Sequence, residues 1–299
     1  MTMLPVAFSN LVVPGLAKVT SDKFQALAKQ AKYKRIFEVK SSKKQYEEGL
    51  LIEGFGAAVE KNVGNPVEFV DLTEGYKTTW THATYARGTR IAQETYDDDL
   101  YKVFSGKLST YLSRSIYQRA ELVAASVFNN GFTTTGADGK ALFATDHPYK
   151  SGGTYSNLLS TAADLSETAL EAMITLLETT KDAGSIDLSL VAKKLIINPK
   201  EKFNARRILK SNQQPGTANN DTNALKEENL ELIIWHFITD IDSFYLQGDQ
   251  HSLVYWNRQK PKIESGDDFD TGDAKIKVTM RCSAGYDDPR GMVGTPGGD

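Results

Sequence analysis

One stretch in the first half of the chain constrains the fold more than any other. Between Asp97 and Asn130, apolar side chains recur at every third or fourth position: Leu100, Val103, Phe104, Leu108, Leu112, Ile116, Ala120, Val123, Ala124 and Val127. This spacing predicts an amphipathic helix, and the three aspartates at 97–99 suit its N-terminus. At ~1.5 Å per residue it would be about 50 Å long, more than a typical globular helix. We therefore expect a scaffold element with something extended lying along it.

Composition and charge exclude several functional classes. The 299 residues are 40% apolar and carry a net charge of −3, so the chain lacks the overall basic character of a nucleic-acid binder. Its single cysteine, Cys282, excludes an internal disulfide framework. No apolar run approaches the ~20 residues of a membrane span, and the first residues do not resemble a secretory signal. The sequence predicts a cytosolic protein without a membrane segment.

The region before the long helix lacks a core of its own. Residues 1–36 contain one short amphipathic helix from about Ser21, which we expect to pack on another part of the molecule or on a neighbouring chain. Residues 37–96 are β-rich, with strands predicted at 67–70 and 77–85 and glycine-rich turns between them. An isolated two-stranded arm is only marginally stable, so this region needs a partner surface.

The remainder alternates helices and strands and indicates class α+β. A helix capped by Ser166 is predicted to run to about Lys181, and the Asn198-Pro199 pair is predicted to start another that ends near Lys210. Strands are predicted at 190–197, 230–239, 244–246, 253–256 and 274–283.

A search for chemistry yields only weak candidates. Asp146-His147-Pro148 could hold a general base, although a turn stabilised by the aspartate is favoured. Cys282 lies in an alternating strand, which favours packing over nucleophilic catalysis. The acidic run 264–273 resembles a calcium loop in composition but lacks its final glutamate, so a solvated loop is favoured. Gly139-Lys140 lacks the context of a phosphate loop. We predict no catalytic residue, cofactor or metal.

A basic stretch with aromatics at residues 29–44 could contact phosphates or the acidic residues of a sister chain. Contact with protein is favoured because no base-stacking array accompanies it. A rigid spine, two arms that need partners and a compact α+β region together suit a self-assembling shell.

Three runs of residues carry a resemblance to a known family. They are Ala141–Pro148, Leu253–Pro261 and Asp267–Gly291, the last of which contributes the segments 267–273 and 281–291. In their amino-acid sequence and in their order along the chain, these runs resemble the major capsid proteins of tailed double-stranded-DNA bacteriophages, particularly the Mu-type major head subunit group. The resemblance implies the Hong Kong 97-like fold, which divides the chain into five parts. These are an N-terminal arm (1–37), an extended loop or E-loop (38–96), a P domain with the spine helix (97–163), an A domain (164–260), and closing P-domain strands with a tail (261–299).

The resemblance also implies a structural, non-enzymatic function. The chain would form pentamers and hexamers of an icosahedral head that encloses double-stranded DNA and contacts it non-specifically. It would reside in the virion, assemble in the host cytoplasm, and meet a portal and a decoration protein. Because this chain begins at Met1 with no room for a long scaffolding segment, we expect a separate scaffolding protein. The alternatives are an encapsulin-like cellular nanocompartment and a metal-dependent hydrolase that uses Asp146, His147 and the acidic run.

Candidate contacts between subunits come from the extended loop and from the exposed face of the spine helix. They are Lys43, Lys44, Glu53, Phe55, Lys61, Arg114 and Arg119. Some family members form covalent cross-links through a lysine of this loop. In this chain we expect the loop lysines to form no cross-link.

Overall fold

The computed structural model describes residues 22–54, 56–64, 66–71, 73–92, 103–213, 222–268, 271 and 273–298. The chain divides into two compact units, each assembled from segments far apart in sequence. Unit 1 comprises Met1–Glu47, Trp80–Ala124 and Val254–Ala284, and unit 2 comprises Glu48–Thr79, Ala125–Leu253 and Gly285–Asp299.

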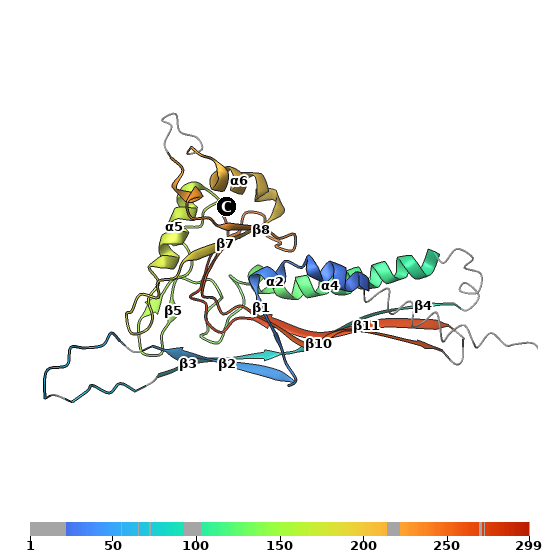
Figure 1. Cartoon of the computed structure of the whole chain (residues 1–299), viewed down its shortest axis with the longest axis horizontal. Coiled ribbons are helices and arrows are strands. Elements are labelled where there is room, and N and C mark those ends of the chain that lie inside the picture. The colour runs from blue at the N-terminus through green and yellow to red at the C-terminus, as the bar shows by residue number, and fades with distance from the viewer. Residues whose placement is uncertain are drawn as a thin grey trace, which may run out of the picture. The chain divides into compact units, whose positions relative to one another are not determined.

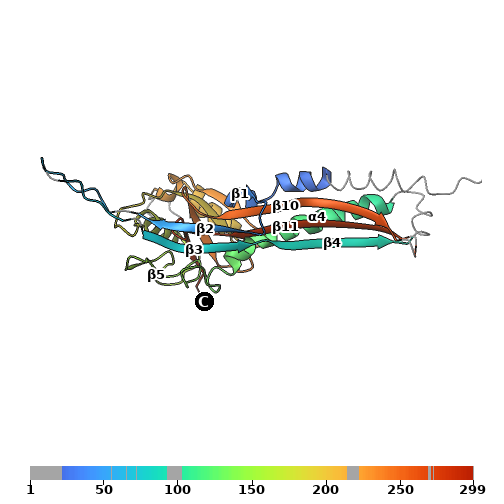
Figure 2. The same ribbon diagram turned by 90° about the horizontal axis from the view of Figure 1, so that it is seen from below.

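Unit 1 is a four-stranded sheet with a long helix along one face (Figures 1 and 2). The strand order is β1 (Glu38–Ser41), β10 (Val254–Asp267), β11 (Ala274–Gly285) and β4 (Ala83–Ile91). The pair β1–β10 is parallel and the pair β11–β4 is antiparallel. The helix is α4 (Val103–Asn129), whose 27 residues correspond to about 40 Å. The predicted spine helix is therefore confirmed over its described part, while Asp97–Asp99 lie outside the described residues.

Alternation in β11 explains why this sheet has one covered face. Ile276, Val278 and Met280 are buried while Lys275 and Lys277 are exposed, which is the period of two expected for a half-buried strand. The covering helix buries Leu112, Ile116 and Ala120 at helical spacing. The apolar face of β11 thus meets the apolar stripe of α4.

The segment before β1 packs on α4 within the same chain. Residues 22–29 are helical and are followed by the short helix α2 (Tyr33–Ile36). The buried carboxylate of Glu121 in α4 accepts the backbone N–H of Lys32 at 2.7 Å. The Tyr33 ring lies 4.5 Å from the Tyr255 ring, between centroids. The N-terminal segment was predicted to pack on another part of its own molecule or on a neighbouring chain. These contacts show that it packs on its own molecule.

Unit 2 contains a second four-stranded sheet whose one face is covered by two helices. Its order is β12 (Met292–Thr295), β9 (Phe244–Gly248), β7 (Ala192–Ile197) and β8 (Glu231–Ile234). The helices α5 (Glu167–Glu178) and α6 (Lys202–Lys210) share one hydrophobic core with β7, β9 and β12. The Ser166 hydroxyl accepts the N–H of Ala169 at 3.2 Å, so the predicted cap of α5 is confirmed. Asn198 caps η2 (Pro199–Glu201), which leads into α6, also as predicted.

The opposite side of β9 contributes to an aromatic cluster. Tyr245 lies 5.0 Å from Phe128 and 5.2 Å from Phe143, between ring centroids. Phe132 and Trp235 extend the cluster. The remaining elements of the unit are η3 (Ala224–Lys226), the pair β5 (His147–Pro148) and β6 (Thr154–Tyr155), and most of the pair β2 (Tyr46–Glu53) and β3 (Thr73–Thr81).

Several strand predictions were wrong. Residues 67–70 form no strand, and the strand predicted over 77–85 is interrupted at His82, so that β3 pairs with β2 and β4 pairs with β11. The strand predicted over 230–239 ends at Ile234, where the chain turns. β10 continues far beyond the predicted 253–256 because ladders on both of its sides supply hydrogen bonds that the local sequence does not reveal.

Candidate assembly surfaces

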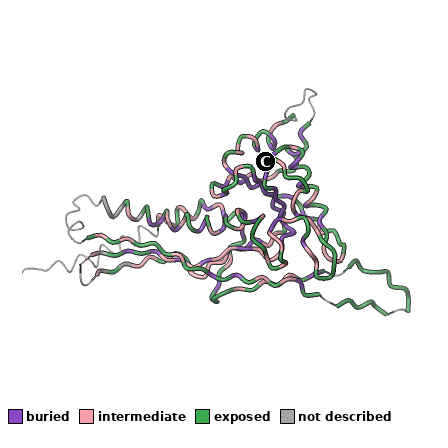
Figure 3. The backbone as a smooth tube through the Cα atoms, turned by 180° about the vertical axis from the view of Figure 1, so that it is seen from behind, coloured by how far each residue is buried: buried purple, intermediate pink, exposed green. Residues whose placement is uncertain are grey.

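The segment that joins β2 to β3 exposes apolar side chains that nothing in the described chain covers. Residues 56–64 and 66–71 are exposed throughout, as Figure 3 shows. The ring of Phe69 is 92% exposed, and Val59, Val63, Val67 and Val70 are also exposed. Contiguous apolar exposure of this kind marks an interaction site.

Glu53 anchors the base of this segment within its own subunit. Its buried carboxylate accepts the backbone N–H of Lys150 at 2.6 Å and that of Ser151 at 3.0 Å. These two charge-assisted hydrogen bonds attach the end of β2 to the turn between β5 and β6. The Glu53 carboxylate is thus buried in its own subunit, and the predicted contact of Glu53 with a neighbouring subunit stays a prediction.

The other predicted contact residues come from several separate segments of the chain. Lys43 and Lys44 are exposed between β1 and β2, with the Lys44 Nζ 3.5 Å from Glu47. Lys61 is exposed in the segment between β2 and β3. Phe55 lies outside the described residues.

The two arginines are on the exposed side of α4. Arg114 is exposed, and the guanidinium of Arg119 lies 5.3 Å from the centroid of the Tyr85 ring. Their contact with another subunit stays a prediction, as does that of the lysines.

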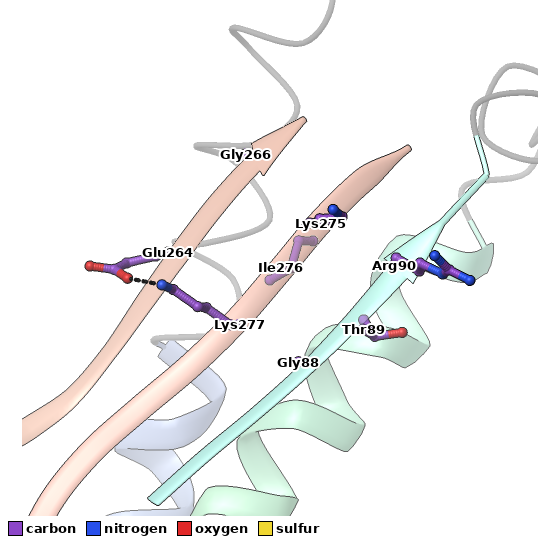
Figure 4. Close-up of a pocket in the computed structure, with 8 residues that line it drawn as sticks. All are labelled: Gly88, Thr89, Arg90, Glu264, Gly266, Lys275, Ile276 and Lys277. Carbon is purple, nitrogen blue, oxygen red and sulfur yellow. Dashed lines mark ion pairs between the residues drawn. The ribbon is translucent and has the colours of Figure 1, made fainter. Parts of the chain in front are cut away.

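A groove of about 810 Å³ lies on the sheet of unit 1 (Figure 4). Its polar lining includes Arg90 of β4, Lys275 and Lys277 of β11, and Glu264 of β10. Glu264 is 2.9 Å from Lys277 and 2.7 Å from Lys262, and hydrogen bonds and charge from these two lysines lower its pKa to about 2.

The start of the acidic run therefore forms ion pairs in and beside a strand. Lys275 pairs with Asp268 in the same way. The predicted solvated loop was wrong for residues 264–267, which belong to β10. Within the described ranges, no group of three or more His, Cys, Asp or Glu residues is placed to hold a metal ion.

His147 is fully buried and bonded at both ring nitrogens. Nδ1 lies 2.5 Å from Oδ2 of Asp138, and Nε2 lies 3.1 Å from Oδ1 of Asn157. The Asn157 amide is fixed, since its nitrogen donates to the carbonyls of Leu142 and Pro289 and its oxygen accepts the N–H of Ala144. Both imidazole nitrogens thus lie within hydrogen-bonding distance of side-chain oxygens, one of the Asp138 carboxylate and one of the Asn157 amide.

This geometry changes the interpretation of the Asp-His-Pro motif. Asp146 pairs with Lys140 at the surface, and it does not stabilise the predicted turn, because His147 and Pro148 form β5. The buried imidazole has no free nitrogen for a substrate. His147 is a packing and hydrogen-bonding residue of unit 2.

The sequence interpretation missed a segregation of charge in unit 2. α5 contains three glutamates and no basic residue, and α6 contains four basic residues and no acidic one. The signal was present in the sequence, as two single-sign helices in one α+β region.

Among the described helices, none combines the length and apolar character of a membrane span.

Comparison with known proteins places these features in context. Residues 75–294 match a family described as phage capsid protein. No curated protein matches the chain in sequence. Solved structures that resemble it include the capsid of the cyanophage P-SCSP1u (TM-score 0.60, 8% identity, covering 88% of this chain and 87% of that one). The capsid of a native GTA particle is similar too (TM-score 0.57, 14% identity, 88% of each chain). So is a virus-like particle from Pyrococcus furiosus (TM-score 0.53, 12% identity, 93% of this chain and 98% of that one).

Proposed function

Because this chain belongs to the phage capsid protein family, we propose that it assembles with copies of itself into pentamers and hexamers of an icosahedral head. Its function is structural, as a protein of the capsid shell, and its fold is the α+β fold of Hong Kong 97-like capsids. The finer assignment to the Mu-type major head subunit group is part of the proposal. It is supported by the runs Ala141–Pro148 and Leu253–Gly291.

The observation that carries self-assembly is the exposed apolar segment between β2 and β3. Phe69 and its neighbouring valines have no cover in the described chain, and a charge-assisted anchor at Glu53 holds the base of the segment. Such a surface is stabilised when a neighbouring copy covers it. We assign residues 38–96 as the extended loop that lies over a neighbour, and α4 with β10 and β11 as the P-domain frame that receives it. The arm 1–37, the A domain 164–260 and the tail after 261 complete this proposed division.

The cargo we propose is double-stranded DNA, contacted without sequence specificity. The net charge of −3 supports weak contact, since a strongly basic chain would bind phosphates tightly. A portal, a decoration protein and a separate scaffolding protein are the further partners, and assembly in the host cytoplasm precedes residence in the virion.

Electron microscopy of the purified full-length chain tests this function. We expect rings, tubes or closed shells, formed by the chain alone or after addition of a scaffolding protein. A monomer that persists at every protein and salt concentration would overturn the proposal. Nuclease-protected DNA inside native particles would support the viral head, whereas a co-purifying enzyme would favour the encapsulin-like compartment. A monomer band alone after boiling in detergent would exclude covalent cross-links.

A further inference from the structure

The exposed surface of α5 carries negative charge only. Glu171 and Glu178 are exposed and Glu167 is partly so, and no basic residue lies in this helix. Glu178 is in the last turn, where the helix dipole disfavours a negative charge, and no basic residue of that turn offsets it. Within the described part of the chain these three glutamates form no ion pair, whereas Lys181 beyond the helix pairs with Asp187. The acidic face of α5, defined by Glu167, Glu171 and Glu178, therefore lacks a cation in its own subunit.

The exposed surface of α6 has the opposite character. Arg206, Arg207 and Lys210 are exposed, and no described acidic side chain pairs with them. Among them the Phe203 ring is 70% exposed, with the Lys202 Nζ 5.5 Å from its centroid. Beside the helix lies a groove of about 570 Å³, lined by α6, η3 and β8. Its lining combines leucine and isoleucine side chains with Arg206, Lys210 and Lys226 and includes no acidic residue. We call this surface, together with Arg207 and Phe203, the basic α6–β8 face.

These two faces lie at different places along one sheet. β12 and β8 are its edge strands. α5 packs against β12, β9 and β7, whereas the groove beside α6 opens along β8. Figure 1 accordingly shows α5 and α6 on different sides of the helical layer of this unit. Two unlike, complementary faces at different places on one subunit suit a head-to-tail contact between copies, which closes into a ring when the rotation allows it.

We infer that the acidic face of α5 on one copy docks on the basic α6–β8 face of the next copy, and that Phe203 is the apolar anchor of this contact. The inference rests on the proposed shell function and names the chemistry that holds its rings together. Charge complementarity selects the occupant, because α5 offers the negative charges that the α6 face lacks. It also fixes the orientation, since α5 against α5 or α6 against α6 would place like charges together.

Charge reversal tests the contact. One variant carries Arg206→Glu, Arg207→Glu and Lys210→Glu, a second carries Glu167→Lys, Glu171→Lys and Glu178→Lys, and a third carries all six substitutions. The third has the net charge of the natural chain and so controls for charge alone. We expect the first two to fold, as judged by circular dichroism and thermal melting, but to remain monomeric in analytical ultracentrifugation. The third should recover rings.

A mixture of the first two variants gives a sharper result. In the first variant both faces are acidic, and in the second both are basic. A copy of one variant can therefore dock only on a copy of the other, so the two variants must alternate around a ring. Alternation closes a ring with an even number of copies but not one with an odd number. The mixture should therefore form hexamers, sheets or tubes under the microscope, and no pentamers or closed shells.

Salt provides a measurement that needs no variant. Rings of the natural chain should dissociate as salt approaches about 1 M, where the screening length falls to ~3 Å. Rings insensitive to salt, single-face variants that assemble as well as the natural chain, or a folded six-substitution variant that stays monomeric would each overturn the inference. In those cases assembly of the natural chain still supports the shell function, whereas a natural chain that never assembles contradicts the shell function itself.

Discussion

The Nδ1 atom of His147 lies 2.5 Å from the Oδ2 atom of Asp138, inside unit 2 where no part of the imidazole is exposed. Burial alone raises the pKa of Asp138, but hydrogen bonds from His147 and from the backbone N–H of Lys140 lower the pKa overall. A carboxyl whose pKa is lower in the folded chain stabilises the fold above its unfolded pKa. That contribution is lost as the pH falls through the folded value.

Asp138→Asn should therefore destabilise the subunit at pH 7 by about 1–3 kcal/mol, because it removes the carboxylate that is hydrogen-bonded to a fully buried imidazole. Denaturant unfolding of the unassembled subunit at several pH values measures this loss. The difference between variant and natural chain should shrink as the pH falls from the ordinary carboxyl pKa of about 4 through the lower pKa of the folded chain. Asp146→Asn, which breaks only the surface pair with Lys140, is the control and should cost well under 1 kcal/mol. Equal effects of the two substitutions would refute the role given to His147.

A second prediction concerns Gly294 and the packing of the aromatic cluster. A Cβ atom there would lie 2.9 Å from two atoms of the Phe143 ring, closer than real Cβ contacts. Gly294→Ala should push this ring from its place and cost about 1–3 kcal/mol, as overpacking of a core does. Gly266→Ala is the matched control, since nothing lies within 4 Å of its Cβ position. Thermal melting compares them, and an unchanged melting temperature for Gly294→Ala would contradict the packing described.

A third prediction concerns Glu121 and the attachment of the N-terminal segment to α4. Its carboxylate accepts the N–H of Lys32 and also the hydroxyl of Tyr117, at 3.1 Å. Burial and the charge of Glu121 together raise the pKa of Tyr117 to about 12. Glu121→Leu should expose residues 22–36 to limited proteolysis while the rest of unit 1 resists. In Glu121→Gln, spectrophotometric titration should show the pKa of Tyr117 moving back toward its usual value. A titration identical to that of the natural chain would count against the contact.

A fourth prediction concerns Phe69 and distinguishes an effect on assembly from an effect on the stability of the subunit. Because its ring is 92% exposed, Phe69→Ser should change the free energy of unfolding of the isolated subunit by no more than about 0.5 kcal/mol. The yield of shells or rings should fall strongly, since the apolar contact with a neighbour is lost. Asn62→Ser, at another exposed position of the same segment, should assemble normally. Sedimentation of assembled particles is the readout, and full assembly of Phe69→Ser would remove the segment from the contact.

The elements that could be predicted from sequence were those with a strong local period. The apolar residues recur with a period of about 3.6 residues in α4 and of two residues in β11, and both elements were predicted. β10 was mostly missed because its residues 257–267 include Pro261 and few apolar side chains. Its pairing with β1 and β11 depends on contacts remote in sequence. The interaction of His147 with Asp138 and Asn157 was missed for the same reason, since short loops bring these residues together without any periodic signal.

The parallel pairing of Glu38 with Val254 has a consequence for synthesis on the ribosome. The first strand of unit 1 emerges early, but the strands that complete its sheet are among the last to be translated. Until β11 has emerged, the apolar stripe of α4 has no sheet to cover it. A polypeptide interrupted before its C-terminal region thus cannot finish this frame. The order of the strands thereby makes completion of unit 1 depend on translation through β11.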